Sequence, residues 1–222
     1  MARAVARPEG IVGDREYGLI DASTGQPATP EKEARWRKAL HLKAAYLDGE
    51  LPIIAFPDGR SCSLNDGALK ETLTEYFGFP TAMAAYNHSE RPLGFALTTF
   101  RHRHFPLHLL TTSSLERLAA LCRRDAIDVR RFRPTALIEV EKGSGFVEND
   151  WIGRRVRLGG LTLNAEEDAK RCGVTFISQP GIEEDPEILR NILRNNKRHL
   201  GIYCSSNASG TIVEGDEVFV GA

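Results

Sequence analysis

Four stretches of the chain have the pattern of a helix. The clearest follows Asn65 or Asp66 and ends at Gly78, a residue type that readily adopts the left-handed conformation at a helix C-terminus. Its apolar residues are three or four positions apart and share one face: Leu69, Leu73, Tyr76 and Phe77. A shorter helix is predicted after Thr29, because Pro30 suits the first helical position.

Two further helices are predicted from capping residues that precede an apolar stripe. Ser113 and Glu116 have the spacing of a capping box. Asp185 and Pro186 open the last helix. The expected buried faces are Leu115, Leu118, Ala119 and Cys122 in the first of these helices, and Ile188, Leu189, Ile192 and Leu193 in the second. The last helix ends in Lys197 and Arg198, whose charges complement its dipole.

Strand patterns dominate the last third of the chain. Apolar residues alternate over 156–163 about Gly159-Gly160, which predicts a hairpin. Other strand-like runs are 136–140, 174–178, 200–204 and 211–220, the last with a turn at Glu214-Gly215. Short strands separated by turns favour a β-barrel, because closure removes exposed edges. The expected fold class is mainly β (α+β): a barrel with peripheral helices and a smaller, β-rich N-terminal domain.

The charge balance gives no reason to expect a polyanionic partner. The 222 residues include 29 Lys and Arg against 30 Asp and Glu, a net charge of −1. This length suffices for one large or two small domains with a sizeable core. No segment approaches the roughly 20 apolar residues that span a bilayer. We therefore expect neither nucleic acid nor a membrane among the partners.

The cysteine pattern argues against a structural metal site. The four cysteines are widely spaced, without a CxxC pair or a Cys/His cluster at zinc-ligand spacing: Cys62, Cys122, Cys172 and Cys204. The first ten residues lack the apolar core of a signal peptide. We expect a cytoplasmic protein with reduced thiols.

Five short segments occur in an order that is specific for one family. The sequence RRFRP lies at 130–134, preceded by LLTTSS at 109–114 and followed by KRC at 170–172. A closing segment begins with GTI at 210–212, and GIVGDR lies upstream at 10–15. These segments resemble the MOSC domain, named for the C-terminal part of molybdenum cofactor sulfurase. The upstream one is similar to the N-terminal β-domain of amidoxime-reducing enzymes.

The resemblance implies a MOSC β-barrel over residues 91–222, preceded over 1–90 by a truncated domain of the MOSC N-terminal type. It also implies molybdenum cofactor (molybdopterin) bound through Cys172. Positions that match the motifs, and are expected to bind cofactor, are Arg15, Arg131, Arg133, Thr135, Thr111, Thr112, Lys170 and Arg171. Two features depart from cofactor-carrying relatives. A Lys-Ser strand does not precede the GDR segment, and the Asn after FRP is Thr135.

Cys172 is the expected catalytic residue and metal ligand. A soft thiolate binds molybdenum and also accepts a persulfide sulfur. Arg171, with Arg131 and Arg133, would favour the thiolate electrostatically. Arg133 and Arg131 would also bind the phosphate of the cofactor through paired hydrogen bonds, and Arg15 would bind it from the first domain. The alternatives are a small buried core cysteine and solvent-facing arginines.

Neighbouring polar residues have ordinary interpretations as well. Thr111 and Thr112 lie at a predicted helix start and could hold a phosphate, whereas we assign Ser113 to capping. His102 and His104 alternate, but no Asp, Glu or Cys completes a local metal-binding set, so we expect a pocket wall or a solvated edge.

Three functions remain open from the sequence. The leading hypothesis is a molybdenum-cofactor-dependent oxidoreductase that reduces N-oxygenated small molecules, with electrons from a separate donor protein. The second is metal-free sulfur transfer through a Cys172 persulfide, loaded by a sulfur-donor protein. The third is a carrier or binding module for the cofactor.

Overall fold

The computed structural model describes residues 2–46, 51–86, 95–98, 106–143 and 145–221, and it divides the chain into two compact units. The barrel unit comprises Met1–Asp14, His104–Ile177 and Glu184–Ala222. The small unit comprises Arg15–Arg103 and Ser178–Glu183. The boundary expected at residue 90 stays a prediction, whereas the first strand belongs by its pairing to the barrel unit.

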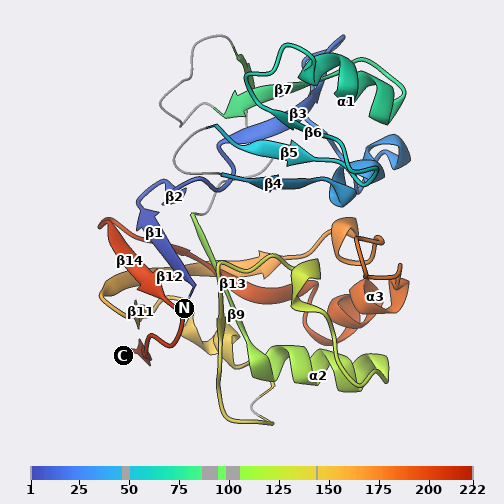
Figure 1. Cartoon of the computed structure of the whole chain (residues 1–222). Coiled ribbons are helices and arrows are strands. Elements are labelled where there is room, and N and C mark those ends of the chain that lie inside the picture. Colours follow the sequence, from blue (N-terminus) through green and yellow to red (C-terminus); the bar gives the residue numbers. More distant parts are fainter. Residues whose placement is uncertain (1, 47–50, 87–94, 99–105, 144, 222) are drawn as a thin grey trace. The chain divides into compact units, whose positions relative to one another are not determined.

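The barrel unit is built on a six-stranded sheet that curves into a nearly closed barrel (Figure 1). Its strands, in spatial order, are β10 (Ala136–Ile138), β9 (Leu107–Thr111), β13 (His199–Ser205), β12 (Leu161–Lys170), β11 (Arg155–Leu158) and β15 (Val218–Val220). All neighbours are antiparallel except β9 and β10, which are parallel. The predicted mainly β fold is confirmed.

A second, three-stranded sheet belongs to the same unit. It is formed by β14 (Gly210–Val213), β1 (Arg3–Arg7) and β2 (Gly10–Ile11). The first strand of the chain thus pairs with a strand some 200 residues later, for example Val5 with Thr211. Ala6 is fully buried and joins the barrel core. The two ends of the sequence therefore stabilise one unit.

Alternation along the strands fills the barrel. In the predicted hairpin, Val156, Leu158, Leu161 and Leu163 are buried while the residues between them in each strand are exposed. Trp151, in the 3₁₀ helix Val147–Trp151, packs against the same core. The hairpin and the inward face of its strands were predictable because a strand repeats every two residues.

Two helices carry a second apolar cluster of this unit. They are α2 (Thr112–Cys122) and α3 (Pro186–Asn195), which pack against each other. Asp185 caps α3 as predicted, by accepting a bond from the Glu187 N–H at 3.1 Å. In α2 the cap is Thr111, not Ser113, because the Thr111 hydroxyl accepts from Ser114 N–H. Leu193, predicted to be buried, is 56% exposed.

Three further predictions are corrected in part or in full. Residues 174–178 do not form a strand, since Gly173–Thr175 is a 3₁₀ helix. The strand predicted over 136–140 ends at Ile138. The helix expected after Thr29 is a 3₁₀ helix, η1 (Ala34–His41), and it begins only after a turn. By contrast, strands near 200–204 and 211–220 are present, the latter divided by a turn.

The small unit consists of two three-stranded sheets and α1 (Leu69–Phe77). One sheet contains β3 (Tyr17–Asp21), β7 (Thr81–Tyr86) and β8 (Ala96–Thr98), and the other β4 (Lys43–Ala45), β5 (Ile53–Ala55) and β6 (Ser61–Ser63). Gly78 ends α1 with a φ of 82°, as predicted. Trp36 is 1% exposed and packs edge-on against Phe77 and Phe79.

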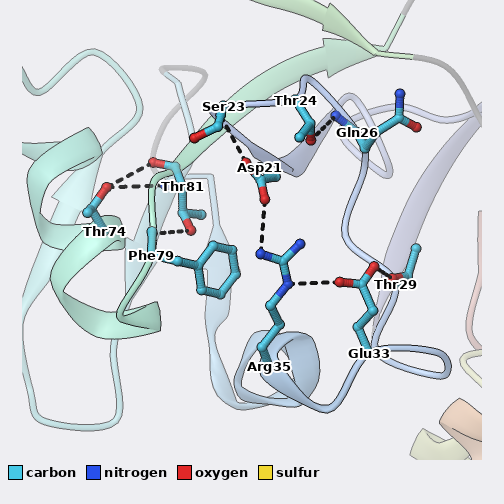
Figure 2. Close-up of polar contacts among 10 residues, drawn as sticks. All are labelled: Asp21, Ser23, Thr24, Gln26, Thr29, Glu33, Arg35, Thr74, Phe79 and Thr81. Atoms are coloured by element: carbon cyan, nitrogen blue, oxygen red, sulfur yellow. Dashed lines mark hydrogen bonds and ion pairs between the residues drawn. The ribbon is translucent and has the colours of Figure 1, made fainter.

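A polar network joins β3 to η1 in the small unit (Figure 2). Arg35 bridges Asp21 at 3.0 Å and Glu33 at 2.8 Å. The backbone N–H of Ser23, and then Arg35, hold the pKa of Asp21 below its ordinary value. The guanidinium of Arg35 also lies 4.3 Å from the ring of Phe79. The network therefore ties the turn after β3 to the aromatic core.

Candidate functional site

Cys172 lies two residues beyond the end of β12, at the start of a 3₁₀ helix. Its carbonyl accepts hydrogen bonds from the backbone N–H of Thr175 at 3.1 Å and from the Thr175 hydroxyl at 2.9 Å. These two bonds close a tight turn that fixes the backbone of the cysteine. Among the four cysteines, all of which the structure describes, only Cys172 is not buried.

The other three cysteines are core residues. Cys62 is 8%, Cys122 7% and Cys204 0% exposed. Burial raises the pKa of Cys122, and it raises the pKa of Cys204 to about 12. A thiol with so high a pKa stays protonated at neutral pH and is a poor nucleophile. Cys172 is therefore the most accessible of the four thiols.

Arg171 is the buried neighbour of this cysteine. Its Nη2 donates to the carbonyl of Phe132 at 2.8 Å, and its Nη1 lies 3.4 Å from Nε2 of the buried His108. The guanidinium carbon is 5.4 Å from the centre of the Phe132 ring. The side chain thus joins the end of β12 to the RRFRP segment. Lys170 is exposed and faces His199 across the strand pair.

Arg131 approaches the same turn from the RRFRP segment. It is 7% exposed, and its Nη1 lies 3.3 Å from the carbonyl of Thr175. Burial lowers the pKa of Arg131. Arg131 is the last residue of a 3₁₀ helix, Val129–Arg131, and does not lie in a strand. Its burial therefore does not follow from the alternation of side chains along a strand. Arg171 of the KRC motif binds the carbonyl of Phe132 in the RRFRP motif, and Arg131 of the RRFRP motif binds the carbonyl of Thr175 in the turn after Cys172. The two motifs, 40 residues apart in the sequence, therefore meet beside Cys172.

Arg133 and Thr135 differ in their surroundings. Arg133 is exposed, with a φ of 49° in the left-handed region that few non-glycine residues adopt. Thr135 exchanges bonds with His108: its hydroxyl accepts from the His108 N–H at 3.0 Å, and its own N–H donates to the His108 carbonyl at 2.7 Å. The Thr135 side chain therefore holds the start of β9.

The hydroxyls at the start of α2 hold a buried carboxylate. Glu148 is fully buried and accepts from Thr111 at 2.7 Å and from Ser114 at 2.7 Å. The Thr112 hydroxyl accepts from Val140 N–H, and the Ser113 hydroxyl donates to the Gly145 carbonyl. These contacts give each hydroxyl a structural use. The first N–H groups of α2 have no acceptor within the helix, as at every helix start.

Two regions singled out in the sequence lie outside the described part of the barrel unit. Arg15 is exposed and is the first residue of the small unit, so its part in the Cys172 site stays a prediction. His102 and His104 lie outside the described residues. Within the described ranges no three His, Cys, Asp or Glu side chains gather as a metal site.

Sequence reasoning missed three residues that hold parts of the barrel unit together. Glu148 lies in a polar stretch that gives no sign of burial, and His108 follows the stretch with His102 and His104 that was interpreted as a pocket wall or a solvated edge. Arg198 was interpreted as complementing a helix dipole. A histidine within an apolar run, LHLLT, is the one signal that could have indicated burial.

A separate hollow of about 920 Å³ opens beside the edge strands β10 and β15 of the barrel unit. Leu137 and Phe219 line it, as do the acidic residues Glu139 and Glu217. Thr135 also lines it, whereas Cys172 does not. The thiol and this hollow are therefore distinct features.

The fold is thus a nearly closed, mainly β barrel with peripheral helices and an accessible cysteine at the end of a strand. Residues 90–219 match the family model of the MOSC domain. The match covers more than half of the chain, and the chain belongs to the MOSC domain family.

Solved structures add a weaker likeness. YiiM from Geobacillus stearothermophilus is 11% identical with a TM-score of 0.41, over 53% of this chain and 55% of that one. The YuaD protein from Bacillus subtilis is 12% identical with a TM-score of 0.47, over 99% of this chain and 85% of that one. Neither likeness carries an argument about function. No curated protein matches the chain. The described part of the chain has no helix with the length and apolar character needed to cross a membrane.

Proposed function

We propose that Cys172 binds the molybdenum of a molybdenum cofactor and that the protein reduces N-oxygenated small molecules. The observation that carries this proposal is that Cys172 alone among the cysteines is accessible, in a turn where two arginine-bearing motifs of the MOSC domain meet. A soft thiolate is a suitable protein ligand for molybdenum. The cations Arg131 and Arg171 are held by backbone carbonyls beside it.

The residues present fit such a group in two respects. Cys172 offers the thiolate, and Arg133 offers an exposed guanidinium for the phosphate. Arg131 and Arg171 are buried, so they position the turn and add positive charge near it. The hydroxyls of Thr111 and Thr135 hold Glu148 and His108, and we assign them to the support of the site.

When bound, the cofactor supplies the two-electron chemistry that breaks an N–O bond. The overall reaction takes two electrons and two protons and releases the reduced nitrogen compound and water. A separate donor protein supplies the electrons. The contribution of this chain is to hold the thiolate in a fixed turn and to surround it with positive charge.

The decisive variant is Cys172→Ser, with Cys204→Ser as a matched control. Serine replaces a soft ligand with a hydroxyl that stays protonated at neutral pH, so the molybdenum content of protein from a molybdate-fed host should fall to background. Because Cys172 is partly exposed, the thermal midpoint of the Cys172→Ser variant should hardly differ from that of wild type. Cys204→Ser buries a hydroxyl in the barrel core and should lower the midpoint, at a cost of roughly 1 to 3 kcal/mol, yet keep the metal.

The activity measurement uses a small amidoxime and a reduced dye as electron donor. Wild type and Cys204→Ser should turn over, and Cys172→Ser should not. Full molybdenum content and activity in Cys172→Ser would refute the proposal. Wild-type protein that contains molybdenum but does not reduce the amidoxime would instead identify a cofactor carrier.

A second candidate function is sulfur transfer through a persulfide on Cys172. One observation favours it: the hydroxyls of Thr111 and Thr135, which were expected to bind the cofactor, form hydrogen bonds within the protein. A persulfide does not need these hydroxyls, because it requires only the accessible thiol and the cations beside it. The Cys172 thiolate would attack the outer sulfur of a donor persulfide, form a new S–S bond and release the donor thiolate. Intact mass would then show one added sulfur atom, removable by dithiothreitol and absent from Cys172→Ser.

A further inference from the structure

Arg198 and Arg171 hold each other by two reciprocal hydrogen bonds. The backbone N–H of Arg171 donates to the carbonyl of Arg198 at 2.9 Å, and the Nε of Arg198 donates to the carbonyl of Arg171 at 2.7 Å. That second carbonyl belongs to the peptide group that joins Arg171 to Cys172. The guanidinium of Arg198 is therefore fixed one peptide group from the cysteine.

The backbone at Arg198 is held in an unfavourable conformation to achieve this. Its φ is 74°, and that of the preceding Lys197 is 49°. Left-handed geometry costs a non-glycine residue roughly 1 to 2 kcal/mol. The position is maintained by the bond from Arg198 N–H to the carbonyl of Ile192 at 3.1 Å, which closes the end of α3. Folding thus places this side chain at the cysteine turn rather than leaving it in solvent.

Among the described residues, no carboxylate neutralises the charge of Arg198. In the described ranges no carboxylate oxygen lies within ion-pair distance of its guanidinium, and its one protein acceptor is a neutral carbonyl. The residue is half-buried. Since Nε is engaged, the two Nη groups remain to form a pair of parallel N–H donors. Such a pair matches the two oxygens of a carboxylate or a phosphate.

We infer that Arg198 binds an oxyanion group, phosphate or carboxylate, of the molecule that meets Cys172. The inference rests on the proposed function in one respect, that Cys172 is the reactive centre. It adds a binding residue from the β13 side of the barrel unit and names the chemical class of the ligand as anionic. Arg198 binds through its Nη groups and holds the Cys172 turn through its Nε.

The charge near the sulfur can be measured without cofactor or substrate. Iodoacetate and iodoacetamide alkylate a thiol by the same displacement, but only iodoacetate carries a carboxylate. Because the other three cysteines are buried, both reagents report on Cys172 in the native protein. The ratio of the two rates cancels any change in accessibility or reactivity that affects both reagents, so a structural loss alone does not change it.

We expect Arg198→Gln to lower the iodoacetate-to-iodoacetamide ratio by about two- to fivefold, because one positive charge is removed from the cysteine turn and the carboxylate reagent is attracted less. Arg198→Lys should lower this ratio less than Arg198→Gln does, because the positive charge remains while the planar pair of donors is lost. Arg194→Gln, which removes an exposed arginine of α3, is the control and should leave the ratio unchanged. Equal ratios in wild type and Arg198→Gln would overturn the inference.

Two further arms identify the source of the oxyanion. Inorganic phosphate should protect Cys172 from iodoacetate in wild type and less in Arg198→Gln; equal protection in both would count against the inference. If the oxyanion is the phosphate of the cofactor, Arg198→Gln should lose molybdenum. If it is a carboxylate of the substrate, metal content should persist while KM rises only for carboxylate-bearing substrates. Wild type without molybdenum would refute the cofactor proposal yet leave the alkylation ratios as a valid test.

Discussion

The hydroxyl of Thr111 donates a 2.7 Å hydrogen bond to the carboxylate of Glu148, 37 residues later in the sequence, and both side chains are fully buried. Thr111 also caps α2 by accepting from the Ser114 N–H, while the Ser114 hydroxyl binds the same carboxylate. The start of α2 is thus anchored to the 3₁₀ helix Val147–Trp151.

Removal of the buried carboxylate should therefore destabilise the barrel unit. Glu148→Ala leaves two buried hydroxyls without their acceptor and creates a void, which should cost about 2 to 3 kcal/mol of unfolding free energy. Urea unfolding followed by far-UV circular dichroism measures the change. Glu139→Ala removes an exposed carboxylate of the same unit and should stay within about 0.5 kcal/mol of wild type. A Glu148→Ala variant as stable as that control would contradict the anchoring role.

Thiol reactivity should distinguish Cys172 from the other cysteines. The thiolate is the reacting form, and burial raises the pKa of Cys204 to about 12, so this thiol stays protonated through pH 9. Native protein treated with iodoacetamide at pH 8 should gain one adduct, located on Cys172 by peptide mass mapping. Unfolded protein should gain four. Early modification of Cys204 in the native protein would show that the barrel core opens readily.

Gly201 should not tolerate a side chain. Its φ is 80°, and a Cβ there would lie 2.6 Å from the carbonyl oxygen of Leu109 and would also clash with the His108 ring. Gly201→Ala should therefore lose at least about 2 kcal/mol, from left-handed strain and overpacking together. Gly160→Ala is the control, because nothing lies within 4 Å of its Cβ position and its φ is not in the left-handed range. Thermal midpoints of the two variants should differ clearly; equal midpoints would disprove the close approach.

The small unit should lose stability in acid. Folding lowers the pKa of Asp21 and of Glu33, through the Ser23 N–H first for Asp21 and the Thr29 hydroxyl first for Glu33, with Arg35 acting on both. A carboxyl whose folded pKa is depressed contributes stability above its unfolded pKa and loses it as the pH falls through the folded value. The ordinary values are 3.8 and 4.5, so this contribution should be complete above about pH 5 and decline below pH 4.

Arg35→Gln should reduce this pH dependence without abolishing it, because the Ser23 and Thr29 donors remain. In a Trp151→Phe background, fluorescence of Trp36 during urea unfolding at pH 3 and pH 6 reports on the small unit, where this tryptophan is buried. The difference in midpoint between the two pH values should be smaller in the variant. An unchanged difference would mean that the Arg35 ion pairs contribute nothing to folding.

Local patterns were sufficient for several elements of the fold. The 156–163 hairpin, the Gly78 helix end and the Asp185 cap each depend on a few adjacent residues, and each is present. The strand predicted over 174–178 failed because its apolar residues bend into a 3₁₀ turn, which the Thr175 hydroxyl closes on the Cys172 carbonyl. A period of two over five residues does not distinguish these outcomes.

The sequence by itself determined the family and the cysteine that lies within its motifs. Motif order requires no knowledge of contacts, and it indicated Cys172 among four cysteines. Only the tertiary structure decided how the neighbouring residues are used: Arg131 and Arg171 hold carbonyls of other segments, Thr111 holds Glu148, and Arg198 reaches the cysteine turn. These bonds join residues 27 to 44 positions apart. Such separations have no periodic signal, because they are set by how strands and turns meet in space.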